Sequence, residues 1–155
     1  MKKNQNKLII VISSPSGAGK TSVCKKLIEK DKYIGLSVSD TTRKARDNEI
    51  NGVDYNFIQE KEFKERIKNH SYIEYANVFG NFYGSRRQNI FNYFKTNRDV
   101  LFDIDWQGAK QLKNSDLSNI ISIFIIPPSK DAIYQRLVSR AKTSGDDEKA
   151  IDNRM

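Results

Sequence analysis

The sequence predicts an α/β protein with a parallel sheet at its core and a section of mixed structure inserted into that core. Three apolar segments carry the prediction, and they span residues 8–13, 100–105 and 120–126. They are rich in β-branched side chains and do not alternate with polar ones, which is typical of strands buried on both faces of a parallel sheet. Segments with helical spacing of apolar residues follow these strands, as in an α/β core. The length of 155 residues suits one domain.

The first part of the core is expected within residues 1–38. Its strand over 8–13 ends in a cluster of serine, proline and glycine residues. A helix is expected over 21–30, because its apolar side chains recur three and four positions apart. The apolar run over 33–38 is a candidate second strand.

Residues 39–97 have a different sequence pattern from the core, which predicts that they form the inserted section. Aromatic and charged residues alternate here over short stretches, between turn-forming residues. The elements expected, in order, are a loop over 40–52, a strand over 55–58, a helix over 61–68, a strand over 72–79, an aromatic turn over 81–83 and a helix over 86–95.

The sequence pattern of the core, apolar strands alternating with helices, returns over residues 98–139. The elements expected, in order, are a strand over 100–105 that ends in carboxylates, a helix over 107–112, a strand over 120–126 stopped by two prolines, and a helix over 130–140. Trp106 is expected to pack against its surroundings. Residues 142–150 are polar and are expected to form an exposed flap.

Composition and charge narrow the classes of function. Lysine and arginine outnumber the acidic residues 27 to 19, and the net charge of +8 favours anionic partners. The basic residues are scattered and no aromatic ribonucleoprotein motif accompanies them, so nucleic acid is not the expected partner. One cysteine and one histidine leave little scope for a disulfide or a zinc site. The apolar stretches are too short for a signal peptide or a membrane span, so a cytoplasmic protein without membrane association is expected.

The segment between the first strand and the first helix has the pattern of a phosphate-binding loop. Small residues let successive backbone N–H groups point at phosphate oxygens, and the helix N-terminus adds its positive dipole end. The lysine of such a loop reaches the β- and γ-phosphates, and the hydroxyl after it binds Mg²⁺. Ser14 stands where the motif has its first glycine, so this backbone must suit an L-residue or carry strain. The loop predicts binding of a nucleoside triphosphate or a similar anion through Ser14, Pro15, Ser16, Gly17, Ala18, Gly19, Lys20 and Thr21.

Four further segments, read with this loop, resemble the guanylate kinase family. Residues 37–49 are similar to the signature S-V-S-x-T-T-R-x-P-R-x-G-E, with Ala45 and Asn48 in place of its proline and glycine. Three shorter blocks resemble G-x-D-Y-x-F over 52–57, N-x-Y-G-[ST] over 81–85 and D-I-D-x-Q-G over 103–108. The blocks follow one another in the family's order, and the chain is identified as a member of that family on this resemblance.

The resemblance implies a three-layer core carrying the phosphate loop, an inserted GMP-binding domain and, over residues 140–155, a small mobile lid with the start of a truncated C-terminal helix. It also implies a Mg²⁺-dependent reaction in which ATP and GMP give ADP and GDP, and dGMP stays open as a further acceptor. The implied partners are these small nucleotides, and both a monomer and a homodimer remain open. The family continues past Met155 with more helix, a further strand and a closing helix, so the chain resembles a member that lacks its C-terminal segment.

The hydrogen-bonding groups of guanine explain why two of the implied site residues are a carboxylate and a hydroxyl. Guanine presents N1–H and N2–H₂ as adjacent donors, which one carboxylate can accept together, and O6 as an acceptor for a hydroxyl. The family pattern assigns these roles to Glu74 and Ser39. Adenine would leave both groups unpaired, and a site of this kind rejects such an analogue by about 10⁴–10⁵. Asp103 and Asp105, two apart at a strand end, are implied to contact a Mg²⁺-bound water and guanine, and the sequence leaves open which does which.

The resemblance also implies how the phosphates are held. Arginine offers a planar fork for phosphate oxygens, which lysine cannot reproduce. The residues implied for the GMP site are Ser39, Arg43, Arg46, Glu49, Tyr55, Glu74, Tyr83, Ser85, Asp103 and Asp105. Mg²⁺ is implied at Thr21, with Asp103 contacting it through water. The catalytic residues implied are Lys20 and Arg43 together with the lid arginines Arg136, Arg140 and Arg154, which would neutralise charge on the transferred phosphoryl group.

Two other functions stay open. Guanylate-kinase-like domains also act as inactive binding modules, although the presence of Lys20, Arg43 and Glu74 favours an enzyme. A kinase for another nucleoside monophosphate is the second alternative, and a comparison of GMP with AMP and dTMP as acceptors would distinguish it.

Overall fold

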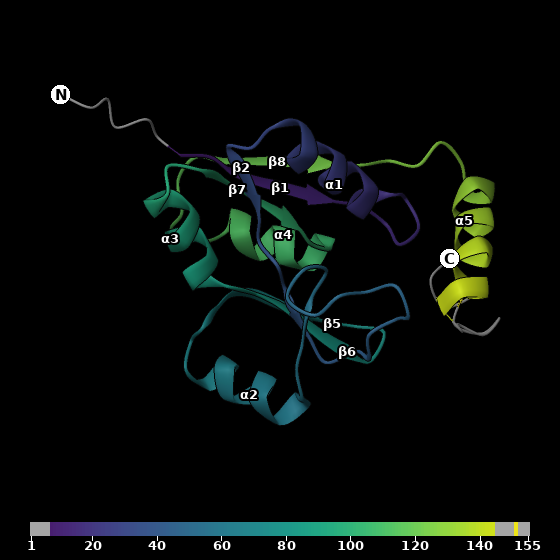
Figure 1. The fold of residues 1–155 in the computed structure, drawn as a ribbon, viewed down its shortest axis with the longest axis horizontal. Helices are drawn as coiled ribbons and strands as arrows, with labels where there is room; N and C mark the ends of the chain where they lie inside the picture. Colours follow the sequence, from purple (N-terminus) through teal and green to yellow (C-terminus); the bar gives the residue numbers. More distant parts are fainter. Residues whose placement is uncertain (1–6, 145–150, 152–155) are drawn as a thin grey trace.

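The computed structural model describes residues 7–144 and 151, which form two sheets with helices around them (Figure 1). The core sheet contains β1 (Ile9–Ser13), β2 (Ile34–Leu36), β7 (Asp99–Asp103) and β8 (Ile120–Phe124) in the order β2-β7-β1-β8. Every pairing in this sheet is parallel. The predicted α/β core with a parallel sheet is therefore confirmed.

Helices cover both faces of the core sheet. Alternate side chains of a strand point to opposite faces, and here the side chains on both faces are apolar. On one face, α1 (Lys20–Lys30) packs its buried Cys24 against Ile12 and Leu101. On the other face, α3 (Arg87–Lys95) and α4 (Trp106–Lys113) bury Ile90 and Leu112 against Val11 and Phe102. Figure 1 shows the three layers, with α1 on one side and α3 and α4 on the other. The apolar runs of β1 and β7 are continuous because both faces of these central strands are covered.

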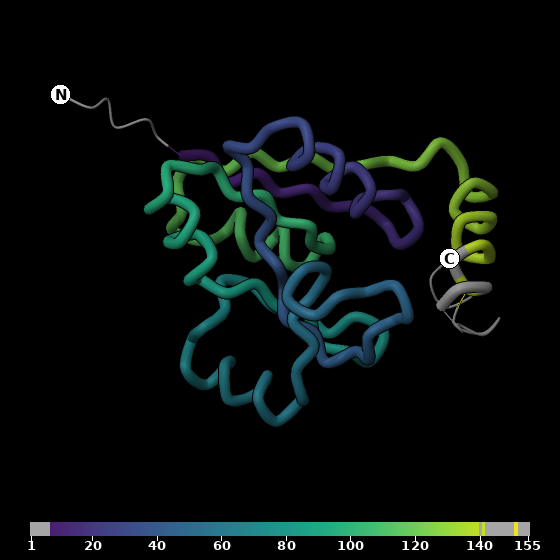
Figure 2. Tube along the Cα trace, viewed as in Figure 1, coloured from purple at the N-terminus to yellow at the C-terminus, as the bar shows by residue number. Residues whose placement is uncertain are grey.

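The second sheet is built from residues 40–86. It contains β3 (Asp40–Thr41), β4 (Asn56–Phe57), β5 (Tyr72–Val78) and β6 (Asn81–Arg86) in the order β4-β3-β6-β5. Figure 2 shows the chain leaving the core after β2, building this sheet and returning through α3. The helix α2 (Glu60–Lys68) covers it, and the ring of its buried Phe63 stacks 4.5 Å from Tyr72 and 5.3 Å from Phe82.

Two predictions for this section are wrong. The segment over 81–83, expected to be a turn, begins β6 and pairs antiparallel with β5. The turn lies at Phe79 and Gly80, whose positive φ angles of 51° and 79° reverse the chain one step earlier. The expected loop over 40–52 begins with a short strand, because Asp40 and Thr41 pair with β4 and β6. Both strands are set by tertiary pairing and not by local alternation.

Asp40 is fully buried and joins the elements of the second sheet. Its carboxylate accepts hydrogen bonds from Tyr72 Oη at 2.8 Å, from Asn56 Nδ2 at 2.9 Å and from Arg86 Nε at 2.9 Å, and it pairs with Arg66. These partners come from β4, β5, β6 and α2. A buried charge is tolerated only when it is paired and hydrogen-bonded in this way.

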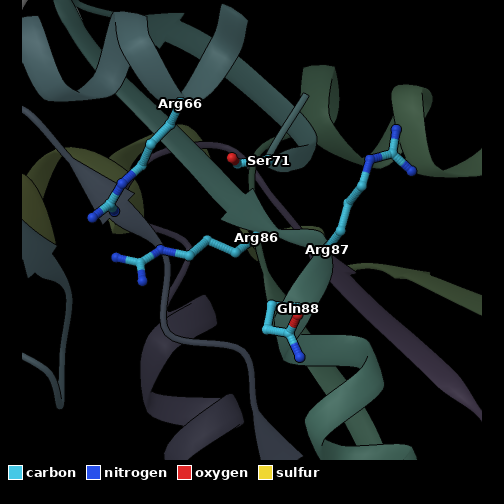
Figure 3. Close-up of a pocket in the computed structure, with 5 residues that line it drawn as sticks. All are labelled: Arg66, Ser71, Arg86, Arg87 and Gln88. Atoms are coloured by element: carbon cyan, nitrogen blue, oxygen red, sulfur yellow. The ribbon is translucent and has the colours of Figure 1, made fainter. Parts of the chain in front are cut away.

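The arginines of this network line a cavity of about 300 Å³ together with Ser71, Arg87 and Gln88 (Figure 3). The guanidinium groups of Arg66 and Arg86 extend to the same side in Figure 3, whereas Arg87 extends away from them. Asp40 holds the first two, and Glu62 also pairs with Arg66. The charges of Arg66 and Arg86 are thus balanced by the carboxylates of Asp40 and Glu62.

Asp40→Ala is expected to lower the free energy of unfolding by about 3 kcal/mol, because two half-buried guanidinium groups, a phenol and an amide would lose their common buried acceptor. Urea unfolding followed by circular dichroism measures the change. Asp47→Ala is the matched control, since Asp47 is exposed in the following loop. A loss in Asp40→Ala no larger than that of the control would contradict the organising role of this carboxylate.

The last described helix, α5 (Lys130–Ser144), follows β8 and lies beside the loop between β1 and α1 in Figure 1. It extends past the predicted end at residue 140, while most of the expected flap and lid lies outside the described residues. Among the described strands, β8 is at the edge of the core sheet, and its side chains Ile121, Ile123 and Phe124 are exposed. In the part of the chain that is described, no helix is long and apolar enough to cross a membrane.

Candidate functional site

The phosphate loop connects the end of β1 at Ser13 to the start of α1 at Lys20. Gly17 and Gly19 have φ angles of 79° and 92°, which L-residues rarely adopt. A Cβ on Gly17 would also lie 3.2 Å from side-chain atoms of Ile133 and Leu137 in α5. Ser14 is not among the residues with positive φ, so the backbone there suits an L-residue and the missing glycine causes no strain. The loop therefore has the backbone that a phosphate cradle requires.

Lys20 forms an ion pair with Asp103 across the mouth of this loop. The pairing follows from the sheet, because β1 and β7 are parallel neighbours and Ile12 is in register with Asp103. Both side chains keep a small exposed fraction, 18% for Lys20 and 12% for Asp103. They lie at the carboxyl end of the strands, where open α/β sheets bind their ligands.

Thr21 lies in the first turn of α1 and is exposed. Its hydroxyl and the carboxylate of Asp103 are hard oxygen donors, which suit Mg²⁺. Within the described residues, no group of three or more His, Cys, Asp or Glu side chains could hold a metal ion by itself. This donor set fits Mg²⁺ bound mainly through substrate phosphates and water, which is how nucleotide-dependent enzymes usually hold it.

A second cluster lies in the other sheet, where β3, β5 and β6 bring together Ser39, Glu74 and Ser85. The two hydroxyl oxygens of Ser39 and Ser85 are 3.1 Å apart, and the hydroxyl and backbone N–H of Ser85 donate to the Glu74 carboxylate. All three residues are buried, with exposed fractions of 6%, 3% and 0% in chain order. The cluster thus combines one carboxylate with two hydroxyl groups.

The pKa of Glu74 is raised to about 7, chiefly by burial and in part by the nearby Asp105, against the opposing effects of the Ser85 hydrogen bonds and the charge of Lys20. A carboxyl group in this environment changes its protonation near neutral pH. The influence of Lys20 also shows that the serine–glutamate cluster lies within electrostatic reach of the phosphate loop.

Asp103 and Asp105, left unresolved by the sequence, have different neighbours in the structure. Asp103 pairs with Lys20, as described above. Asp105 is the N-cap of α4, and its carboxylate accepts hydrogen bonds from Gly108 N at 3.0 Å and Gln107 Nε2 at 3.1 Å. Asp103 therefore faces the phosphate end of the site and Asp105 the end near Glu74.

A third cluster consists of Arg43, Arg46 and Glu49 in the loop after β3. Both terminal nitrogens of Arg43 donate to the two oxygens of Glu49, at 2.9 Å and 2.8 Å. The backbone N–H of Arg46 donates to the same carboxylate at 2.8 Å, and its guanidinium lies 3.3 Å from it. Although burial would raise the pKa of Glu49, these hydrogen bonds lower it below its ordinary value. Glu49 is thus an anion that fixes and partly neutralises the arginines.

Two tyrosines complete this third cluster. Tyr83 accepts a hydrogen bond from Arg43 Nε at 3.3 Å, and the Arg43 guanidinium lies 5.5 Å from the centre of the Tyr55 ring. Burial raises the pKa of Tyr55, and the charge of Asp103 raises it further. The arginine–tyrosine cluster therefore also lies within electrostatic reach of the carboxyl end of β7.

The predicted lid arginines are only partly described. Arg136 of α5 donates from a terminal nitrogen to the carbonyl oxygen of Ala18 at 2.9 Å, so it contacts the phosphate loop directly. Leu137, next to it, is almost fully buried against the same loop. Arg140 lies on α5, but its side chain is outside the described residues, and Arg154 is outside them altogether.

The structure corrects the expectation for Trp106 and adds detail for Glu49. Trp106, expected to pack, is 61% exposed at the start of α4. Glu49, implied by the resemblance to belong to the GMP pocket, accepts hydrogen bonds from Arg43 and from the backbone N–H of Arg46. Asp40 and Gly108 were not singled out by the sequence, and their importance depends on neighbours from other segments of the chain.

The comparisons with known proteins agree with this arrangement. The guanylate kinase family model matches residues 5–155. This chain belongs to the guanylate kinase family. It is 48% identical over 149 residues to the guanylate kinase of Jannaschia sp. and 46% identical over 155 residues to that of Rickettsia bellii. These alignments cover 96% and 100% of the chain, but 67% and 78% of the two relatives.

A solved structure supports the same assignment at the level of the fold. The crystal structure of guanylate kinase from Anaplasma phagocytophilum matches with a TM-score of 0.73 and 40% sequence identity, over 90% of this chain and 69% of that one. The predicted family and the predicted fold class of this guanylate kinase family member are therefore confirmed.

Proposed function

We propose that this member of the guanylate kinase family transfers the γ-phosphoryl group of ATP to GMP, giving ADP and GDP. The single observation that carries the proposal is the placement of two clusters around the phosphate loop. The buried carboxylate–hydroxyl cluster of Glu74 suits a guanine base, and the arginine–tyrosine cluster of Arg43 suits a phosphate. Both clusters lie within electrostatic reach of the pair formed by Lys20 and Asp103.

In this proposal the Glu74 carboxylate accepts the N1–H and N2–H₂ groups of guanine, and the Ser39 hydroxyl turns from Ser85 to donate to O6. Ser85 keeps Glu74 in position through hydrogen bonds from its hydroxyl and backbone N–H. Adenine lacks the 2-amino donor and carries a donor at position 6, so it would leave buried polar groups unpaired. This cost makes the pocket selective for guanine.

The phosphate of GMP would contact Arg43 and Arg46, with Tyr55 and Tyr83 beside them. Glu49 fixes the Arg43 fork before the substrate arrives, so less side-chain freedom is lost on binding. A phosphate oxygen of GMP is already a nucleophile at neutral pH, so the reaction needs no general base. The contribution of these residues is to position the acceptor in line with the transferred group.

The donor would bind with its phosphates in the backbone cradle of residues 14–21, where Lys20 leaves Asp103 to contact the β- and γ-phosphates. Arg136 is close enough to the loop to neutralise charge on the transferred group. Arg140 and Arg154 are proposed to assist it from the lid. Thr21, with Asp103 acting through water, would hold Mg²⁺, which supplies further neutralisation of the phosphate charge when bound.

A coupled assay for ADP formation tests this function. With ATP and Mg²⁺, we expect turnover with GMP and little turnover with AMP or dTMP, and we expect an excess of EDTA to abolish it. Comparable turnover with AMP or dTMP would favour a kinase for another nucleoside monophosphate. Binding of GMP without any phosphoryl transfer would favour an inactive binding module.

A further inference from the structure

The helix α4 approaches Glu74 more closely than any residue with a side chain would allow. An added Cβ on Gly108 would lie 2.3 Å from Glu74 Oε2 and 3.0 Å from Glu74 Cδ. It would also lie 3.2 Å from Ile104 Cδ1 on the neighbouring side. The first two distances are below or at the limit that real Cβ atoms show, so something would have to move.

Glu74 has little room to make that movement. It is only 3% exposed, and Ser85 binds its carboxylate through two groups. In a close-packed interior a displaced carboxylate must also displace its neighbours or lose its hydrogen bonds. A residue with a Cβ at position 108 would thus push the Glu74 carboxylate away from the place where Ser85 and Ser39 hold it.

A second residue of α4 fixes the strand that carries Glu74. The side-chain amide of Gln111 donates to the carbonyl oxygen of Tyr75 at 2.7 Å and accepts from the Tyr75 N–H at 3.2 Å. Gln111 follows Gly108 by three positions and therefore lies on the same side of the helix. It occupies the backbone groups of Tyr75 next to Glu74, in the manner of a neighbouring strand.

We propose that Gly108 and Gln111 form a positioning face of α4 that sets where the Glu74 carboxylate stands and thereby sets the selectivity for guanine over related purines. The inference rests on the proposed function, because it assumes that Glu74 reads the base. Gly108 acts by allowing close approach, and Gln111 acts by fixing the register of β5 against the helix. Neither residue is proposed to contact the nucleotide.

The helix α4, which carries this positioning face, also connects the two ends of the site. The N-cap of α4 is Asp105, which follows β7, and Asp103 at the end of β7 pairs with Lys20. One short helix therefore links the strand end at the phosphate loop to the base-reading glutamate of the other sheet. A change at Gly108 is expected to alter base recognition while leaving the phosphate loop in place.

Equilibrium titration of Gly108→Ala with GMP and with IMP tests the proposal, with Lys110→Ala as the matched control. IMP has the same phosphate and O6 but lacks the 2-amino group that Glu74 would accept. Trp106, the single tryptophan, lies at the start of α4 and supplies a fluorescence signal for binding. Lys110 is an exposed residue of the same helix, between the two proposed positions.

In the wild type we expect GMP to bind about 10- to 100-fold more tightly than IMP, because one hydrogen bond to a charged group distinguishes them. In Gly108→Ala we expect this preference to fall toward one, through weaker GMP binding, with ATP affinity unchanged. The variant is expected to melt cooperatively, since alanine favours the helix by about 1 kcal/mol over glycine. A residue with only a structural role would change the affinities for GMP and IMP together and leave their ratio as it was.

Wild-type preference for GMP that persists unchanged in Gly108→Ala would overturn the proposal. If that variant does not melt cooperatively, Gln111→Ala decides, because Gln111 is exposed and its removal leaves a folded helix. It is expected to reduce the preference about 2- to 10-fold, as for one or two neutral hydrogen bonds, and an unchanged ratio there would also overturn the proposal. Absence of GMP binding in the wild type would instead be a failure of the proposed function.

Discussion

Lys20→Ala is expected to lower phosphoryl transfer from ATP to GMP about 10³-fold, whereas the affinity for GMP stays near that of the wild type. The lysine is the side-chain cation of the phosphate loop, and loss of one such charge from a transferring phosphoryl group costs about this factor. The GMP cluster has its own cations in Arg43 and Arg46, which do not contact Lys20 in the structure. Steady-state kinetics and a GMP titration together measure the two effects.

The exposed Lys26, on the same helix, supplies the matched control. Lys26→Ala is expected to leave kcat and KM for both nucleotides unchanged, because Lys26 is exposed on α1 six positions beyond Lys20. The assignment of roles would be wrong if Lys20→Ala kept its fold but no longer bound GMP. It would also be wrong if the variant kept wild-type turnover.

Glu74→Gln is expected to weaken GMP binding about 10³-fold while ATP binding persists. The glutamine amide can accept one of the two guanine donors, but its N–H₂ group would face the other donor, so a buried repulsion replaces a hydrogen bond. Glu65→Gln is the control, because Glu65 is exposed on α2. Calorimetric titration with GMP measures the effect, and near-equal affinities in Glu74→Gln and Glu65→Gln would contradict the role of Glu74.

The same variant is expected to change how stability depends on pH. Burial raises the pKa of Glu74 to about 7, from an ordinary value of 4.5 in the unfolded chain. The folded state therefore keeps a proton that the unfolded state loses, and the contribution of Glu74 to stability is full below pH 4.5 and falls as the pH rises toward 7. The total loss is on the order of 3 kcal/mol.

Glu74→Gln cannot lose this proton, so its stability relative to the wild type is expected to increase between about pH 5 and pH 8. Urea unfolding at both pH values checks the trend. GMP requires the ionised carboxylate, and its affinity for the wild type is accordingly expected to fall as the pH drops below about 7. If the free energy of unfolding changed with pH equally in the two proteins, the pKa of Glu74 would not be raised in the folded state, and this prediction would be contradicted.

Much of the fold and the site could be predicted from local sequence. The strands β1 and β7 were recognisable because burial on both faces leaves continuous apolar runs. The strand β8 has the same apolar composition, although its side chains Ile121, Ile123 and Phe124 are exposed at the edge of the described sheet. The phosphate loop was recognisable because its glycines and lysine have fixed spacing between a strand and a helix. Short blocks of residues at family-like spacing then indicated the GMP-binding residues.

The remaining features depend on contacts between distant segments, and no local pattern carries them. The start of β6 looked like a turn because Gly80 and Gly84 flank it, yet pairing with β5 and β3 makes the segment extended. The role of Asp40 depends on partners that lie 16 to 46 positions away in the chain. Gly108 is restricted by Glu74, which is on another sheet, so helical propensity alone would have favoured an alanine there.

A thermal melt of the chain with and without GMP, and with AMP as the comparison, tests the central claim that a guanine-selective nucleotide pocket is built around Glu74. A ligand that binds only the folded state adds about 2.7 kcal/mol of stability at a hundredfold excess over its Kd. We expect GMP to raise the midpoint and AMP to leave it unchanged, with the GMP effect lost in Glu74→Gln. A cooperative melt that GMP does not shift, or that AMP shifts equally, would contradict the claim.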